Sequence, residues 1–584
     1  MNWKIKNENN NPENISVGSP RFDEMSCRVE AGKYHPVILK LLFNRGIARE
    51  EEIEKHFRFD YENDLADPLA ISGMEKAAAR IIRAGEKKEK VAIFGDYDAD
   101  GVTASAVLFE TLVSLGLGEA MCYIPDRQTE GYGLNEKAIK YLYAQGVKLI
   151  VTVDCGITNI AEVGKAKNLG MDIIITDHHH APQDLPAAYA IINPNVSDSG
   201  FEFKELAGVG VAFKLATALY RMKAPEKIEQ LKWLLDLVAI GTIADCVPLL
   251  GENRLLVKYG LVVMAKTRRA GLVELFQVGR INISENKVPD AHKVAFQIAP
   301  RINAAGRMDH ANTAYKLLIE KKPSVARDLA LDLERNNQDR QKVTAEIFRE
   351  VEILANNSFR DKKFIFAENA HWPVGVLGLV AGKITEAFQK PTVILQRQEN
   401  VLVGSLRSVP AVNIIENLER CRELLIKFGG HSQAAGVSVT FEKAEKFYEK
   451  MDALVAGQLV GHESVSAIEI DAEIAAEDIG WELAGDLKKM EPFGIGNTQP
   501  VFLVRNMVVV DAKIVGNGQK HWKISLRGGG NSPKVFDAIG FSLVEKFPDL
   551  KKDDRLEVVF NLEEDEWNGN KKLQLKLIDL KLAD

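Results

Sequence analysis

The chain has 584 residues, a formal net charge of −7 and 46% hydrophobic residues. This length exceeds what one hydrophobic core usually supports, so we expect several domains. The mild acidity argues against a protein that coats nucleic acid by its overall charge, although a basic surface can still be local.

No apolar run is long enough to cross a bilayer, and no cleavable signal is recognisable, so we expect a cytoplasmic protein without membrane contact. The five cysteines are scattered, and no two have metal-ligand spacing. They predict reduced thiols rather than a disulfide framework or a zinc site. They are Cys27, Cys122, Cys155, Cys246 and Cys421.

The first 71 residues carry a helical pattern at 36–57 but no recognisable chemistry, and we expect them to pack as an extension on the domain that follows. From about 72 to 250, predicted strands and helices alternate. Such alternation predicts βαβ units and a parallel sheet with helices on both faces.

Three acidic residues lie between a predicted buried strand at 91–94 and a helix that begins at 102. They are Asp96, Asp98 and Asp100. Carboxylates at alternate positions repel one another unless cations neutralise them, which favours a metal site. The alternative is a solvated acidic turn in which Asp100 caps the helix.

Further acidic motifs follow other elements of this domain. Asp154 and Asp177-His178-His179 directly follow two predicted strands, and Asp245 follows an apolar helix. One Asp after a strand is commonly a cap or turn residue. Because parallel strands end at the same edge of a sheet, however, these motifs can converge on one site.

Four of these segments resemble the motifs of a known superfamily. They are Gly95-Asp-Tyr-Asp-Ala-Asp-Gly101, Val153-Asp-Cys-Gly156, Asp177-His-His179 and Ala244-Asp-Cys-Val-Pro-Leu249. They are similar to the four motifs of the DHH phosphoesterases, and most closely to the RecJ branch of single-strand-specific DNA exonucleases. The resemblance extends from about residue 40 through the C-terminal domain. Many members of the wider superfamily have His where this chain has Asp96.

The resemblance implies a catalytic site that holds two cations, with Asp154 as the bridging ligand and His179 in a supporting position. The expected metal ligands are Asp96, Asp98, Asp100, Asp154, His178 and Asp245. Carboxylate oxygens and imidazole nitrogens without a thiolate suit Mn²⁺ or Mg²⁺, and the His ligands favour Mn²⁺.

The resemblance also implies a substrate site. Arg127, Ser405 and Arg407 would bind a terminal phosphate and set the direction of degradation. His431 would approach the scissile phosphate, while Arg301 and Asn303 would face the strand's backbone. By this interpretation Arg307, which follows in the same motif, would be structural.

The expected architecture is α/β with an all-β end. Its parts are the extension at 1–71, a DHH phosphoesterase domain at 72–310, connecting helices at 311–359, a second α/β, substrate-binding domain at 360–462 and an OB-fold barrel at 463–584. OB folds bind single strands on aromatic and basic side chains. The barrel candidates are Lys520, Trp522, Lys523 and Phe536, although the two aromatic residues fit a core equally well.

By resemblance, the function is a single-stranded-DNA-specific exonuclease that degrades 5′→3′ to mononucleotides in recombination and repair. We expect a monomer that works on single-stranded DNA, with a helicase and a single-strand-binding protein as partners. Two alternatives stay open: a DHH-type phosphodiesterase acting on short oligonucleotides, and a noncatalytic single-strand-binding relative.

Overall fold

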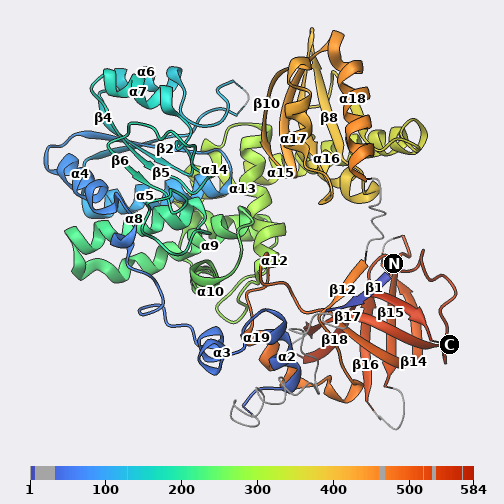
Figure 1. Cartoon of the computed structure of the whole chain (residues 1–584). Coiled ribbons are helices and arrows are strands. Elements are labelled where there is room, and N and C mark those ends of the chain that lie inside the picture. Colours follow the sequence, from blue (N-terminus) through green and yellow to red (C-terminus); the bar gives the residue numbers. More distant parts are fainter. Residues whose placement is uncertain are drawn as a thin grey trace. The chain divides into compact units, whose positions relative to one another are not determined.

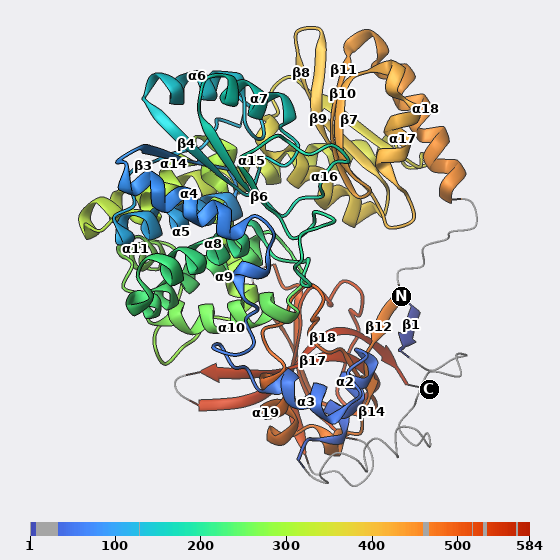
Figure 2. The same ribbon diagram turned by 60° about the vertical axis from the view of Figure 1, so that its left-hand side comes forward.

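The computed structural model describes residues 2–6, 33–127, 129–459, 467–516, 518–528, 534–567 and 570–583. The chain forms two compact units (Figures 1 and 2). Leu65–Ser464 forms an α/β unit, and Met1–Asp64 joins Val465–Asp584 in a unit built around a barrel. We call the second of these the barrel unit.

A five-stranded parallel sheet forms the first domain of the α/β unit, as predicted. In spatial order its strands are β3 (Glu119–Tyr123), β2 (Lys90–Gly95), β4 (Val147–Val153), β5 (Asp172–Thr176) and β6 (Ala190–Ile192). The chain leaves β2 toward β3 on one side and returns to β4 on the other. This reversal is a topological switch point, where loops at the carboxyl ends of the strands make room for a site.

Helices cover both faces of this sheet, so its central strands are buried almost throughout. The helices are α4 (Met74–Glu86), α5 (Ala99–Leu115), α6 (Glu136–Ala144), α7 (Ile160–Asn168) and α8 (Gly208–Lys223). The apolar side chains of α6 and α7 share one core with β2, β4 and β5. Helices α5 and α8 contact the sheet and each other.

Helices then lead to the second domain. They are α9 (Leu235–Ala244), α10 (Gly251–Ala265), α11 (Ala270–Val278), α12 (Ala291–Lys293), the π-helical turn η3 (Val294–Ile298), α13 (Ala299–Met308), α14 (Asn312–Ile319) and α15 (Pro323–Asn357). The 35-residue helix α15 contacts α11, α13 and α14 on one side of the connection and α16 on the other. It therefore joins the two domains of the α/β unit as one continuous helix.

The second domain has a mixed sheet with the order β10-β11-β9-β8-β7. Its elements are β7 (Ile365–Asn369), α16 (Val374–Phe388), β8 (Thr392–Gln398), β9 (Val401–Arg407), α17 (Ile414–Arg420), β10 (Leu425–His431), β11 (Ala434–Thr440) and α18 (Phe441–Leu459). Helix α16 packs on β8 and β9 and also contacts α13 of the first domain.

The barrel unit contains the predicted five-stranded barrel, closed by pairing of β14 with β17. Its strands are β14 (Phe502–Val515), β15 (His521–Arg527), β16 (Val535–Gly540), β17 (Arg555–Trp567) and β18 (Asn570–Leu582). The other elements are β1 (Asn2–Ile5), α2 (Pro36–Asn44), α3 (Glu50–Phe57), β12 (Ala467–Ile470), β13 (Ala472–Glu473) and α19 (Trp481–Lys489).

The N-terminal segment packs on the barrel, which corrects our expectation that residues 1–71 extend the DHH domain. Strand β1 pairs with β12, and α2 contacts α19. The apolar face of α2, including Ile38 and Leu42, lies in the same core as the barrel strands. The expectation failed because the apolar partners of α2 lie more than 400 positions along the chain, beyond any local pattern.

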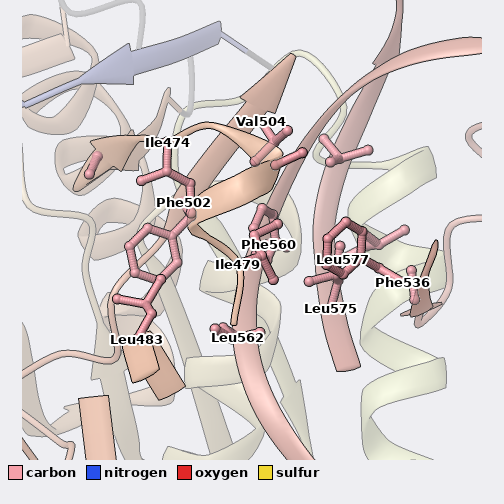
Figure 3. Close-up of a cluster of buried hydrophobic side chains, with 14 of the residues drawn as sticks. Ile474, Ile479, Leu483, Phe502, Val504, Phe536, Phe560, Leu562, Leu575 and Leu577 are labelled. Atoms are coloured by element: carbon pink, nitrogen blue, oxygen red, sulfur yellow. The ribbon is translucent and has the colours of Figure 1, made fainter. Parts of the chain in front are cut away.

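Two of the four barrel candidates are core residues. Phe536 is 7% exposed and lies among Phe560, Leu575 and Leu577 (Figure 3). Trp522 is 4% exposed and belongs to the same core, where its indole N–H donates to the carbonyl oxygen of Phe547. Neither ring can stack on a base, because each points into the barrel. Lys520 and Lys523 are exposed.

Within the described ranges, no helix is both long enough and apolar enough to span a membrane. The described cysteines, Cys122, Cys155, Cys246 and Cys421, are free thiols. Cys27 lies outside the described residues.

The packing of α2 predicts which unit a core substitution weakens. Leu42 is fully buried, so Leu42→Ala should destabilise the barrel unit by about 2–5 kcal/mol. Hydrogen exchange should accelerate at amides of β14 and β17 and stay unchanged in β2 and β4. Leu69→Ala, at a side chain 42% exposed, is the control and should change neither. Acceleration confined to the first α/β domain would contradict this packing.

Candidate metal centre and substrate site

The loop between β2 and α5 fixes the Asp98 carboxylate as a helix cap and buries the Asp100 carboxylate. Asp98 is the N-cap of α5, and its Oδ1 accepts hydrogen bonds from the backbone N–H groups of Asp100 at 3.0 Å and Gly101 at 3.1 Å. Asp100 lies within the first helical turn and is 1% exposed. The cap is therefore Asp98, not Asp100, and the loop turns Asp100 inward.

The buried Asp100 carboxylate is held by the start of α8. It accepts hydrogen bonds from the backbone N–H of Gly208 at 2.6 Å and of Val209 at 2.8 Å. These donors have no partner within their own helix, so an anion satisfies them. Even so, burial and the neighbouring charge of Asp98 raise the pKa of Asp100 to about 7.

Asp154 follows β4 in a left-handed conformation, with φ of 61°. A non-glycine residue with this φ is uncommon and is typical of functional sites. A Cβ at Gly208 would lie only 2.5 Å from Asp154 Oδ1, so a glycine is required there. Asp154 Oδ1 lies 3.2 Å from His178 Nε2, and Asp245 Oδ2 lies 3.6 Å from the same nitrogen.

The structure brings the predicted metal ligands of the four motifs together. Their ligand atoms fall into three overlapping groups, within each of which all atoms lie within 4.8 Å of one another. The groups are Asp96, Asp98 and Asp154; Asp100, His178 and Asp245; and Asp154, His178 and His179.

Four of these ligand atoms are buried without a hydrogen-bond partner. They are Asp96 Oδ1, Asp154 Oδ1, His178 Nε2 and Asp245 Oδ2. Buried polar atoms are otherwise almost always paired. Divalent cations would satisfy all four atoms, and a set of oxygens and nitrogens fits Mn²⁺ or Mg²⁺. The adjacent thiols of Cys155 and Cys246 belong to none of these groups among the described residues.

The two histidines of the third motif have opposite charge states. Burial and the adjacent His179 lower the pKa of His178 to about 4, which keeps its imidazole neutral, the form that binds metal. Burial alone would lower the pKa of His179, but the hydrogen bond from its Nδ1 to Asp177, at 2.7 Å, raises it to about 9. His179 is therefore a cation oriented by Asp177.

Sequence reasoning missed three residues around these histidines. The Tyr132 hydroxyl lies 3.3 Å from His179 Nδ1 and 3.3 Å from the backbone oxygen of Asp154. The amides of Asn193 and Asn195 donate to the backbone oxygens of His179 and His178. The glycines on both sides of Tyr132, which have φ near 80°, are a signal for a shaped loop.

The predicted terminal-phosphate residues come from both domains. The Arg127 guanidinium lies 4.9 Å from the Tyr97 ring, beside the acidic loop. Arg407 and Ser405 of β9 meet over Gly378 of α16, where a Cβ would lie 2.9 Å from Arg407 Nη2 and 3.4 Å from Ser405 Oγ. Burial and the charge of Arg127 lower the pKa of Arg407.

Both arginines of helix α13 contact other helices. Arg301 forms an ion pair with Glu334 of α15 at 2.6 Å, so it braces the two helices. Arg307 donates to the backbone oxygen of Gly375 at 3.1 Å, and burial together with Arg127 and Arg340 lowers its pKa to about 10. Between them, Asn303 Oδ1 accepts from the backbone N–H of Ala99 at 2.8 Å and braces the acidic loop.

His431 ends β10 at an exposed position. Its ring centroid lies 6.5 Å from that of His180, which we had not assigned to the site. The two domains of the α/β unit thus approach each other at two places, Arg307 with Gly375 and His180 with His431.

Three family models match the chain: the DHH family N-terminal domain at residues 90–242, the DHHA1 domain at 361–457 and the RecJ OB domain at 470–579. The single-stranded-DNA-specific exonuclease RecJ of Bacillus subtilis is 36% identical over 97% of this chain and 71% of its own length. The chain belongs to the RecJ family.

Solved structures of RecJ agree with this assignment. RecJ from Thermus thermophilus in complex with Mn²⁺ matches all of the chain and 80% of its own, with a TM-score of 0.81 and 27% identity. The same protein in complex with Mg²⁺ matches all of the chain and 79% of its own, with a TM-score of 0.75 and 26% identity.

The buried carboxylates predict how stability depends on pH and cations. Without a cation, burial and neighbouring charges raise the pKa of Asp100 to about 7 and of Asp245 to about 9. Protonated carboxyls are then favoured in the fold, so stability is present below the ordinary pKa near 4 and is lost as pH rises toward 9. The thermal midpoint in EDTA should fall between pH 5 and 9, as measured by calorimetry.

Saturating Mn²⁺ or Mg²⁺ should largely remove this fall, because cations bind the charged carboxylates. Asp245→Asn should flatten the profile in EDTA, whereas Asp184→Asn, at an exposed position of the same unit, should not. An equal fall with and without cations would contradict the metal-centre assignment.

Proposed function

We propose that this RecJ-family chain is a single-stranded-DNA-specific exonuclease that hydrolyses phosphodiester bonds at the site described above. Two cations, Mn²⁺ or Mg²⁺, would be held by Asp96, Asp98, Asp100, Asp154, His178 and Asp245. The observation that carries this proposal is the set of four buried ligand atoms without hydrogen-bond partners. When bound, such cations polarise the scissile phosphate and lower the pKa of the attacking water.

The protein's own groups add positive charge beside the carboxylates. Without bound cations the pKa of His179 is about 9, and its Nδ1 is fixed by Asp177 at 2.7 Å and lies 3.3 Å from the Tyr132 hydroxyl. A preoriented cation stabilises charge that develops on a phosphate oxygen at little cost in reorganisation. We therefore assign His179 to electrostatic stabilisation and His178 to metal binding.

The arrangement of Arg127, Ser405 and Arg407 supports degradation from a 5′ end. A guanidinium matches the geometry of a phosphate dianion through paired N–H donors. A strand held by its terminal phosphate at these residues would present its first phosphodiester to the neighbouring carboxylates. Repetition of this step would release mononucleotides in the 5′→3′ direction.

Specificity for single strands is supported by the relatives, which are named single-stranded-DNA-specific exonucleases. The barrel would add contacts to a long strand through Lys520 and Lys523. Because duplex DNA must first be opened, a helicase and a single-strand-binding protein are fitting partners in recombination and repair. We expect the chain to act there as a cytoplasmic monomer.

A digestion assay tests the proposal directly. Single-stranded DNA labelled at either end should release labelled mononucleotides from its 5′ end first, and only with Mn²⁺ or Mg²⁺. Asp154→Ala should lower this rate by at least about 10²-fold, because losing a direct ligand should cost no less than losing an outer-shell partner. Asp184→Ala is the matched surface control. Degradation solely from 3′ ends would refute the direction, and metal-independent cleavage would refute the centre.

The terminal-phosphate site predicts a preference for phosphorylated ends. The intact protein should degrade 5′-phosphorylated strands at least about 10-fold better than 5′-hydroxyl strands, since hydrogen bonds to charged groups contribute about 1.5–3 kcal/mol. Arg407→Gln should abolish most of this preference, measured as a ratio of kcat/KM values. Arg397→Gln, which removes an exposed arginine paired with Glu368 in the same sheet, should keep it.

A further inference from the structure

Two segments that build one side of the metal centre come from different parts of the chain. At the start of α8, the backbone N–H groups of Gly208 and Val209 hold the Asp100 carboxylate. The second segment begins at Asp245, the C-cap residue of α9, and leads into α10. With His178, the two carboxylates form one ligand group. The geometry of this group therefore depends on how the two segments are held relative to each other.

Contacts within each segment do little to fix it. The N-cap residue of α8 is Ala207, whose side chain cannot accept a capping hydrogen bond. In the other segment, Cys246 has φ of 62°, in the left-handed region. A non-glycine residue keeps this conformation only where the surrounding structure imposes it. Both segments therefore require support from outside.

Asn253, in the first turn of α10, supplies a contact to both segments. Its side chain is fully buried. The Nδ2 group donates to the backbone oxygen of Glu205 and, at 3.1 Å, to the backbone oxygen of Pro248. Glu205 is three residues before Gly208, and Pro248 is three residues after Asp245. One side-chain amide thus joins the segment that holds Asp100 to the segment that carries Asp245.

The chemistry of this position favours an amide over an apolar side chain. Asn253 Oδ1 is buried without a hydrogen-bond partner, which costs about 1–3 kcal/mol. Leu has a similar shape and would fill the same space without that cost. Among side chains of this size, however, only Asn has two N–H donors on one atom, one for each backbone oxygen. The two donors are therefore what the position requires.

We propose that Asn253 is a positioning residue for the cation held by Asp100, His178 and Asp245. This inference rests on the proposed function, which assigns those three residues to metal binding. Asn253 acts through the backbone, by keeping the two carboxylates at the separation that coordination requires, as outer-shell partners of metal sites do. A second ligand group comes from the loops after β2 and β4, so this amide does not set its geometry. Its members are Asp96, Asp98 and Asp154.

Binding of Mn²⁺ to the full chain without DNA, followed by the electron paramagnetic resonance signal of the free ion, tests the proposal. The intact protein should bind two ions. Asn253→Leu keeps the shape of the side chain but removes both donors. It should weaken binding of one ion by about 10–100-fold, as the loss of an outer-shell partner typically does. Asn253→Ser, whose hydroxyl donates only one hydrogen bond, should weaken the same ion less.

Kinetics on single-stranded DNA give a second measurement. At limiting Mn²⁺, Asn253→Leu should lower kcat, and kcat should recover as Mn²⁺ is raised, because all metal ligands are still present. The KM for DNA at saturating Mn²⁺ should not change. Asp245→Asn removes a ligand itself, so its kcat should not recover. A fall in kcat for Asn253→Leu that added Mn²⁺ does not reverse would overturn the proposal.

Asn417→Leu is the matched control. Asn417 is a fully buried amide of α17 that donates to Gln458 Oε1 at 3.0 Å, in the second domain. Its loss should leave both Mn²⁺ affinities unchanged even where it lowers the thermal midpoint. If Asn417→Leu weakens one ion as Asn253→Leu does, the effect is general destabilisation and the proposal is wrong. Unchanged affinities in Asn253→Leu, or an equal loss at both ions, would also overturn it. An intact chain that binds no Mn²⁺ would instead refute the metal centre of the proposed function.

Discussion

Electrostatic repulsion among carboxylates is the constraint that shapes the first domain. Asp96, Asp100 and Asp154 are each at most 5% exposed, and their ligand atoms lie within a few ångströms of other acidic groups. The fold opposes this repulsion with backbone donors at the start of α8, with the cap at Asp98 and with the left-handed turn at Asp154. These devices fix the groups but do not neutralise them, so cation binding and folding stability are coupled.

Among the described residues, arginines near this acidic centre do not form ion pairs with its carboxylates. The charge of Arg127 lowers the pKa of both Arg307 and Arg407, and in the described part of the chain no carboxylate forms an ion pair with any of the three. The first domain thus supplies an excess of negative charge, and both domains supply arginines. A polyanion whose phosphates lie between bound cations and guanidinium groups complements both, which a neutral or cationic ligand could not do.

The sequence predicted which residues meet at the metal centre, but it did not predict the contacts of individual side chains elsewhere. Asp154 and His178 were predictable because parallel strands end at one sheet edge, so topology alone brings them together. The contacts of Arg301 with Glu334 and of Arg307 with Gly375 were not predictable, because both partners lie on other helices, and the roles of the two arginines stay predictions. The sequence left open whether Trp522 lies in the core, because a strand's alternation shows that residues change face but not which face is the core. His431 and the barrel lysines stay predictions.

The barrel unit joins the first and last segments of the chain, so it can fold only late in synthesis. The backbone N–H of His35, the N-cap of α2, donates a hydrogen bond to the side chain of Asp486. These two residues are 451 positions apart in the chain. During synthesis, α2 and α3 emerge long before the strands that bury their apolar faces, while residues 65–464 can already assemble into the α/β unit. The apolar side chains of Ile38 and Leu42 can therefore reach their native core only after residues 465–584 have been made.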